Sequence, residues 1–185
     1  MTALFSFFLR AKHWQLFLLL FLVPTILEIA TAAYLPETLR SLNDLGAGGL
    51  VYLGLWFIAT ACIFVWLWAM GSFLNSIQKL GVRMNLSFFR VALVFVPVYL
   101  AVFCPVVLIA EPPSQIIAPL HLFATFCIFY AFYFVARSLV TANKGRQVPF
   151  GDYAKPLILL LLFPIGVWSI QPRINQLWAR KSNGE

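Results

Sequence analysis

PLILLLLFPIGVWSIQPR, the stretch from Pro156 to Arg173, decides how often this chain crosses a membrane. It runs apolar for about a dozen residues, breaks at Pro164-Ile165-Gly166 and stops at Pro172. An apolar run of roughly 10–14 residues is more often re-entrant or interfacial than spanning. A helix over residues 153–171 would nevertheless reach about 28 Å, close to the thickness of the hydrocarbon core. The stretch therefore predicts a re-entrant or half-inserted helix, and a fifth span at about 153–171 is the alternative.

The composition of the whole chain is that of an integral membrane protein. It has 185 residues, 62% hydrophobic and 10% charged, with a mean hydropathy of +0.91. A soluble domain is about half apolar and a quarter charged. We therefore expect a single all-α membrane domain over residues 1–185. The net charge of +7 is carried between apolar segments and not in a separate basic domain, so we expect the lipid bilayer as a partner and no nucleic acid.

Four apolar segments are long enough to cross a bilayer as helices. They cover about 14–33, 49–70, 91–110 and 119–136. The segment over residues 1–12 places three phenylalanines ahead of two basic residues, which predicts a short interfacial lead-in. Pro24 and Glu28 interrupt the first segment, so we interpret it as a retained anchor and not as a cleaved signal peptide.

The distribution of basic residues predicts the orientation of these spans. With a cytoplasmic N-terminus, only Arg40 lies outside, and Arg173, Arg180 and Lys181 stay inside if the last stretch turns back. Nine further basic residues then lie inside: Arg10, Lys12, Lys79, Arg83, Arg90, Arg137, Lys144, Arg146 and Lys155. Lys and Arg are enriched in cytoplasmic loops. The sequence therefore predicts that both termini are cytoplasmic.

The connections between the spans carry further local predictions. Residues 71–90 form a loop whose apolar residues (Leu74, Ile77, Leu80 and Val82) suggest an amphipathic continuation of the second span along the surface. Residues 34–48 form a polar loop, residues 111–118 a tight turn, and residues 137–155 the last long loop. Asp152 is placed to cap the helix that enters the closing stretch.

Glu28 and His121 are the most informative polar residues inside the spans. An acid within a span is costly and suggests a function by default. Both residues lie toward the outer face, so a Glu28–His121 pair is a candidate proton relay, metal contact or ligand anchor. A structural hydrogen bond, or an outer vestibule that hydrates Glu28, explains the same residues without a function.

Arg173, Arg146 and Lys155 are candidate contacts for lipid headgroups at the inner surface. Arg173 follows a helix-terminating proline and has Gln171 and Asn175 beside it, a set that can bind a phosphate. Plain interfacial anchoring accounts for the same residues. The aromatic run in 119–136 suits either a packing surface or a site for a planar lipid.

No enzyme motif is found, so we predict no catalytic residue and no enzyme activity. The three cysteines (Cys62, Cys104 and Cys127) lie in different apolar segments without zinc-like spacing, so we predict no metal site and no cofactor.

The segments FPIGVWSIQPRINQLWARK (Phe163–Lys181) and RAKHWQLFLLLF (Arg10–Phe21) resemble those of a group of small uncharacterised bacterial multipass membrane proteins. The similarity extends over most of the chain. It implies a bacterial inner membrane and about four helices, and it carries no activity and no site residues.

The sequence thus predicts a non-enzymatic membrane subunit: a scaffold, a sensor or an assembly partner. Its protein partner, or a second copy of the chain, would dock through membrane helices and through the 73–90 and 137–155 loops. The alternative is a transporter for a small molecule or an ion that uses Glu28 and His121.

Overall fold

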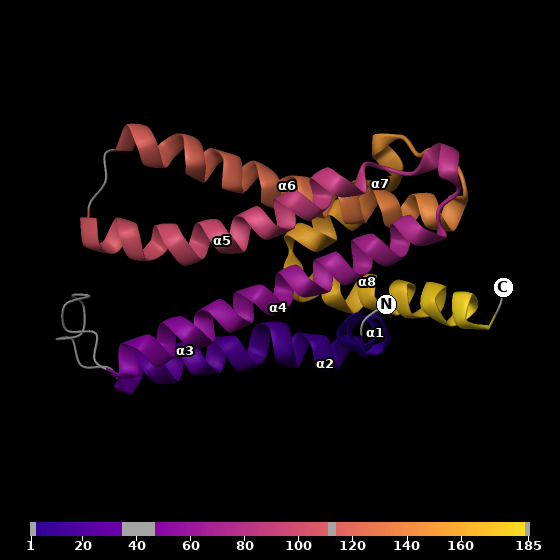
Figure 1. The fold of residues 1–185 in the computed structure, drawn as a ribbon. Helices are drawn as coiled ribbons and strands as arrows, with labels where there is room; N and C mark the ends of the chain where they lie inside the picture. Colours follow the sequence, from indigo (N-terminus) through magenta and orange to yellow (C-terminus); the bar gives the residue numbers. More distant parts are fainter. Residues whose placement is uncertain (1–2, 35–46, 111–113, 184–185) are drawn as a thin grey trace.

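The structure, a computed structural model, describes residues 3–34, 47–110 and 114–183, with side chains for 3–30, 54–79, 81–103, 115 and 117–183. These residues are almost entirely helical and contain no strand (Figure 1). The elements are α1 (Ala3–Arg10), α2 (His13–Phe17), the π-helix η1 (Leu18–Leu22), α3 (Val23–Tyr34), α4 (Ala47–Ile77), the 3-10 turn η4 (Leu80–Val82), α5 (Leu86–Ala110), α6 (Ser114–Lys144), α7 (Phe150–Leu161) and α8 (Phe163–Ser182).

Four helical segments of the described chain are long and apolar enough to cross a membrane. They are His13–Ala30, Gly54–Ile77, Leu86–Phe103 and Ile117–Lys144. They confirm the four predicted spans and the all-α membrane bundle. The chain is a membrane protein.

The spans extend further than predicted at the ends where the basic residues lie. Helix α4 continues to Ile77, which confirms the predicted continuation of the second span into residues 71–90, although its apolar residues lie in the core and not along the surface. Helix α6 continues to Lys144, so the predicted loop start at residue 137 is wrong. The extra turns are helical because they bury side chains in the core: Leu74 and Leu139 are fully buried. Gly145, with φ 65°, then ends α6.

The other predicted connections are described only in part. The prediction of a tight turn at 111–118 is wrong for residues 114–118, because α6 already begins at Ser114. Residues 111–113, and residues 35–46 of the polar loop, lie outside the described residues.

The first span is a composite of α2, η1 and α3. The π-helix lies just before Pro24, and the Val23 N–H donates to the Leu18 carbonyl, five residues back. Proline has no N–H to donate, and its ring would clash with the carbonyl four residues earlier. The wider π turn accommodates that constraint without ending the helix.

Helix α1 confirms the separate lead-in, and one of its faces packs into the bundle. Leu9 is fully buried against the bundle, whereas Leu4 and Phe7 are exposed. Ala11 and Lys12 separate α1 from α2, and the Lys12 N–H donates to Gln15 Oε1 over 2.8 Å. One face of α1 is therefore part of the core, and the other is free to contact lipid.

The closing stretch is a helical hairpin. Helix α7 runs toward the middle of the bundle and α8 returns along it to the C-terminus (Figure 1). Neither helix is among the four candidate spans. The described chain thus has the predicted turn back and no fifth span.

Three details of the predicted hairpin are wrong: the position of its turn, the capping role of Asp152 and the end of the helix at Pro172, which lies inside α8. The turn lies at Leu162 (φ −86°, ψ 54°) and not at Pro164–Gly166. Pro164 instead lies in the first turn of α8. The backbone N–H groups of that turn have no acceptor within the helix, so the missing N–H of proline costs no hydrogen bond. Gly166 permits close packing, because a Cβ there would overlap the Leu159 carbonyl oxygen of α7. Asp152 lies inside α7, and Pro149 occupies the N-cap position without a side-chain hydrogen bond.

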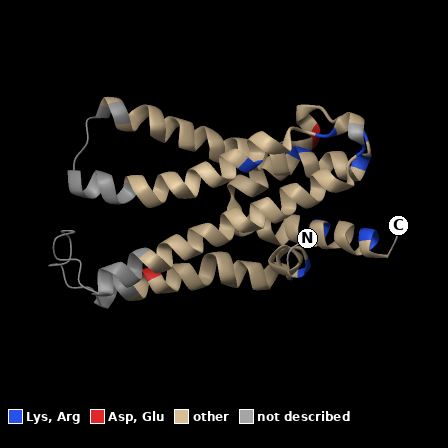
Figure 2. Ribbon diagram, viewed as in Figure 1, with Lys and Arg blue, Asp and Glu red and all other residues tan. Residues whose placement is uncertain are grey.

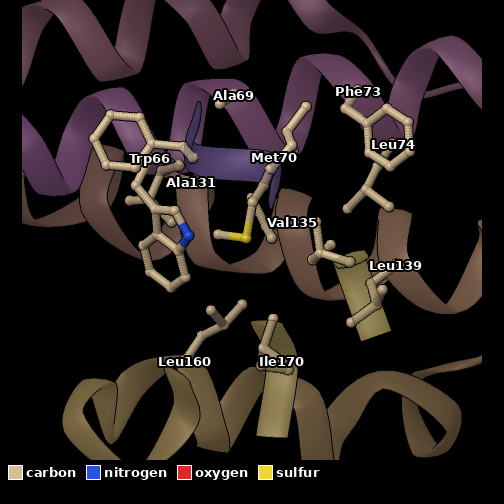
Figure 3. Close-up of a cluster of buried hydrophobic side chains, with 14 of the residues drawn as sticks. Trp66, Ala69, Met70, Phe73, Leu74, Ala131, Val135, Leu139, Leu160 and Ile170 are labelled. Carbon is tan, nitrogen blue, oxygen red and sulfur yellow. The ribbon is translucent and has the colours of Figure 1, made fainter. Parts of the chain in front are cut away.

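The main core lies in one half of the bundle, among α1, α2, η1, α4, α5, α6, α7 and α8. Figure 3 shows Met70 and Trp66 of α4 between α6 and the hairpin residues Leu160 and Ile170. This half also carries all the described Lys and Arg residues, and we call its outer edge the basic end: residues 78–85, 145–149 and 178–183 (Figure 2). Toward the opposite end, the α3–α4 pair and the α5–α6 pair diverge (Figure 1).

Replacing Gly166 tests the hairpin packing. Gly166→Ala should lower the unfolding free energy by about 1–3 kcal/mol, because the new Cβ forces α8 away from the α7 backbone. Thermal unfolding of the purified full chain in detergent measures this. Gly151→Ala in α7 is the control, because no atom lies near its added Cβ. Equal melting temperatures for the two variants would contradict the close packing.

Candidate functional site

Gln171 is the polar centre of the bundle. Its carboxamide is completely buried on α8. Its Oε1 accepts a hydrogen bond from Trp66 Nε1 of α4 over 3.1 Å. Its Nε2 lies 2.9 Å from the Phe8 carbonyl oxygen and 3.1 Å from that of Ala11. One side chain thus joins α8 to α4 and to the end of α1.

Asn175, one turn further along α8, extends the network. Its Oδ1 lies 2.9 Å from Gln171 Nε2, and its Nδ2 donates to the Ala11 carbonyl over 3.2 Å. The two Nε2 hydrogens of Gln171 are therefore shared among three acceptors. The last carbonyls of a helix have no partner within it. The two amides supply such partners for α1, so their position on α8 fixes where α1 lies.

The structure does not bring Glu28 and His121 together. Glu28 is exposed on α3, which packs against η1 and α4, and it has no hydrogen-bond or ion-pair partner among the described residues. His121 lies on α6 and its Nδ1 is 3.2 Å from the Tyr99 hydroxyl of α5. The two residues thus belong to the two helix pairs that diverge (Figure 1). The Tyr99–His121 contact joins α5 to α6. It agrees with the alternative interpretation, in which His121 makes a structural hydrogen bond.

The three predicted headgroup contacts are separate exposed side chains. Arg173 lies on α8, Arg146 in the segment after α6, and Lys155 on α7. The phosphate set predicted around Arg173 is not assembled, because Gln171 and Asn175 both donate to the backbone carbonyl of Ala11, between α1 and α2, instead. Each of the three cations remains free to face lipid headgroups singly.

Other cations near the basic end have protein partners. Lys144 forms an ion pair with Asp152 over 2.8 Å, which ties the end of α6 to the start of α7. Arg137 Nη1 donates to the Tyr133 hydroxyl over 2.7 Å. The Asp152 carboxylate also lies in the first turn of α7, where the helix dipole favours a negative charge. Of these contacts, the Lys144–Asp152 pair holds the hairpin to α6.

The aromatic run of α6 forms a packing ladder with neighbouring helices. Phe123 packs edge-on to Phe95 of α5 with centroids 4.8 Å apart, and Tyr130 packs on Phe88 at 4.7 Å. Tyr133 meets Tyr153 of α7 at 5.6 Å. The rings thus face one another across helices, as expected of a packing surface.

The described residues contain no group of three or more His, Cys, Asp and Glu side chains that could hold a metal ion. Cys62 and Cys127 are free thiols within the spans. The Cys104 side chain lies outside the described part of the chain.

The sequence prediction missed Gln171 as a structural centre. A glutamine at the end of an apolar stretch, followed by Pro172, is typical of a surface position. One pattern in the sequence could have indicated this role. Gln171 and Asn175 are four residues apart, so they share a helix face with the apolar residues Val167, Ile170 and Ile174. A polar pair on an apolar face predicts a buried network, because buried amides need partners.

No family model, curated protein or solved structure matches this chain. The resemblance to small bacterial multipass proteins stays a prediction.

Replacing Gln171 tests whether its amide holds α1 to the bundle. Gln171→Met keeps the size of the side chain and leaves the Trp66 N–H and the Phe8 carbonyl without this partner. Each unpaired buried group costs about 1–3 kcal/mol. The melting temperature should therefore fall, and cleavage by a protease between α1 and α2 should accelerate.

The matched control is Gln176→Met, because Gln176 is exposed on the same helix. It should change neither property. If both variants behave alike, the amide network does not hold α1 in place.

Proposed function

We propose that this protein is a non-enzymatic subunit of a membrane assembly, in which it acts as a scaffold or assembly partner. The observation that carries this proposal is that the first span packs few of its side chains against the rest of the described chain. Only 11% of the residues in His13–Ala30 are buried. No described side chain of α3, from Val23 to Ala30, is buried. A span that buries so little of itself leaves most of its surface to lipid or to another helix.

Glu28 argues for another helix. It lies exposed within the apolar first span and has no partner among the described residues. An acid that faces hydrocarbon is costly, so such residues face protein or water. A partner helix with a hydrogen-bond donor at this depth would satisfy the carboxyl group. The exposed Ile26 and Ile29 beside it would provide the apolar contact.

The rest of the chain suits a scaffold. The best-packed part is the half with the basic end, where the hairpin, α1 and α4 share one core. The α3–α4 pair extends from this well-packed half (Figure 1). A well-packed base that presents an extended helix pair can hold a partner in a defined position without performing chemistry.

We further propose that the protein lies in a bacterial inner membrane with both termini in the cytoplasm. The asymmetric placement of the described Lys and Arg residues supports this (Figure 2). At the hairpin turn, Leu162, Ile165 and Trp168 are exposed. Their apolar surface supports insertion of the turn into the bilayer from the cytoplasmic side, with polar backbone satisfied inside the helices.

Association through α3 has a direct test. The native full chain, purified in lipid nanodiscs formed from its own membrane, should retain a stoichiometric partner or a second copy. Glu28→Leu should weaken that association about tenfold, since an interhelical hydrogen bond in a membrane contributes about 1–2 kcal/mol. Quantitative co-purification and native mass spectrometry measure the retained fraction.

Ile29→Leu is the control, because it keeps the apolar surface next to Glu28. It should retain the partner. A wild-type chain that is monomeric and alone under these conditions would overturn the proposal. A pH-sensitive solute flux in proteoliposomes that Glu28→Gln abolishes would replace it with transport.

A further inference from the structure

Two cations from different segments meet at one residue near the end of α4. Lys181 Nζ, from the last turn of α8, lies 3.0 Å from Ser76 Oγ. Arg83 Nη2, just after η4, donates to the Ser76 carbonyl over 3.3 Å, and its Nε donates to the Gln78 carbonyl over 3.0 Å. Both cations are exposed. Two segments far apart in the sequence thus bring two positive charges to Ser76.

Among the described residues, no acidic side chain balances these charges. Neither Lys181 nor Arg83 forms an ion pair there; the Lys144–Asp152 pair joins α6 to α7 instead. A third cation adds to the charge, because Arg10 Cζ lies 5.9 Å from the ring centroid of Trp178. Trp178 in turn contacts Phe73, and Lys181 Nζ lies 5.7 Å from the Phe73 ring centroid.

Helix capping explains only part of this arrangement. Cations near the last turn of a helix satisfy its carbonyls and favour its dipole. However, Lys181 uses one of its three N–H donors on Ser76 and Arg83 uses two of its five. The remaining donors belong to exposed side chains. They can donate further hydrogen bonds at a site of concentrated positive charge.

The depth of the site indicates the ligand. Ser76 is the penultimate residue of the candidate span Gly54–Ile77, so Lys181 and Arg83 lie where a bilayer places its headgroups. Phe73 and Trp178 lie beside them, as aromatic side chains do at a membrane interface. We propose that Lys181 and Arg83 bind the phosphate group of an anionic membrane lipid through charge-assisted hydrogen bonds. This site is distinct from α3 and does not depend on the proposed assembly.

The test compares bilayers of two compositions. The full chain is placed in nanodiscs of phosphatidylcholine alone or of phosphatidylcholine with phosphatidylglycerol, and retained lipid is counted by native mass spectrometry. The wild type should retain phosphatidylglycerol preferentially. Lys181→Gln and Arg83→Gln should each weaken that preference about fivefold. Arg83→Lys keeps the charge and should lose less. Circular dichroism verifies that each variant is folded.

Arg180→Gln is the matched control, because it removes the same charge from an exposed residue in the last turn of α8 for which the described chain shows no side-chain partner. It should leave the preference unchanged. An equal loss in all three glutamine variants would replace a local site with diffuse attraction, and so overturn the proposal. Soluble inorganic phosphate added to phosphatidylcholine nanodiscs should not stabilise the protein against heat. If it does, and Lys181→Gln abolishes the effect, the source of the phosphate is not a lipid and the proposal is wrong.

Discussion

The buried amide of Gln171 is the interaction on which the rest of the structure depends. It is buried because it lies on the face of α8 that packs into the core, and it has to be paired because an unpaired amide there is costly. Its partners come from α1 and α4, at the beginning and near the middle of the chain. The pairing holds only if the hairpin, the first helix and the second span adopt their positions together. A short apolar stretch that is not among the candidate spans is thereby built into the core.

This arrangement concentrates stability in one half of the molecule. Met70, Phe73 and Leu139 are fully buried there, and the Lys144–Asp152 pair fastens the hairpin to α6 at the same end. The opposite half consists of two helix pairs that diverge (Figure 1). Interior contacts are fewer there, and the apolar faces are left to lipid or partners. This division supports the proposed association through α3, which belongs to the diverging half (Figure 1).

Much of the fold could be predicted because it depends on local properties. Apolar length predicted the four spans, and the proline-broken C-terminal run predicted the hairpin. The helix ends could not be predicted, since α6 continues past residue 136 only because Ser138 and Leu139 find buried positions against other helices. The turn at Leu162 depends on the fit of Gly166 against Leu159, which no local pattern shows. Glu28 and His121 could be assigned a shared depth, but their lateral positions in the bundle are set by helix packing. Gln171 was missed for the same reason.

The hairpin is tested most directly by the side of the membrane on which its end lies. Cysteines are introduced singly at Gln147, between α6 and α7, and at Ser182, at the end of α8, in a chain whose native cysteines are replaced by alanine. A membrane-impermeant thiol reagent is then applied to intact cells and to inside-out vesicles. Both cysteines should react in the inside-out vesicles and neither in intact cells. Labelling of the Ser182→Cys variant in intact cells, with Gln147→Cys protected, would show that the last stretch crosses the membrane and would contradict the hairpin.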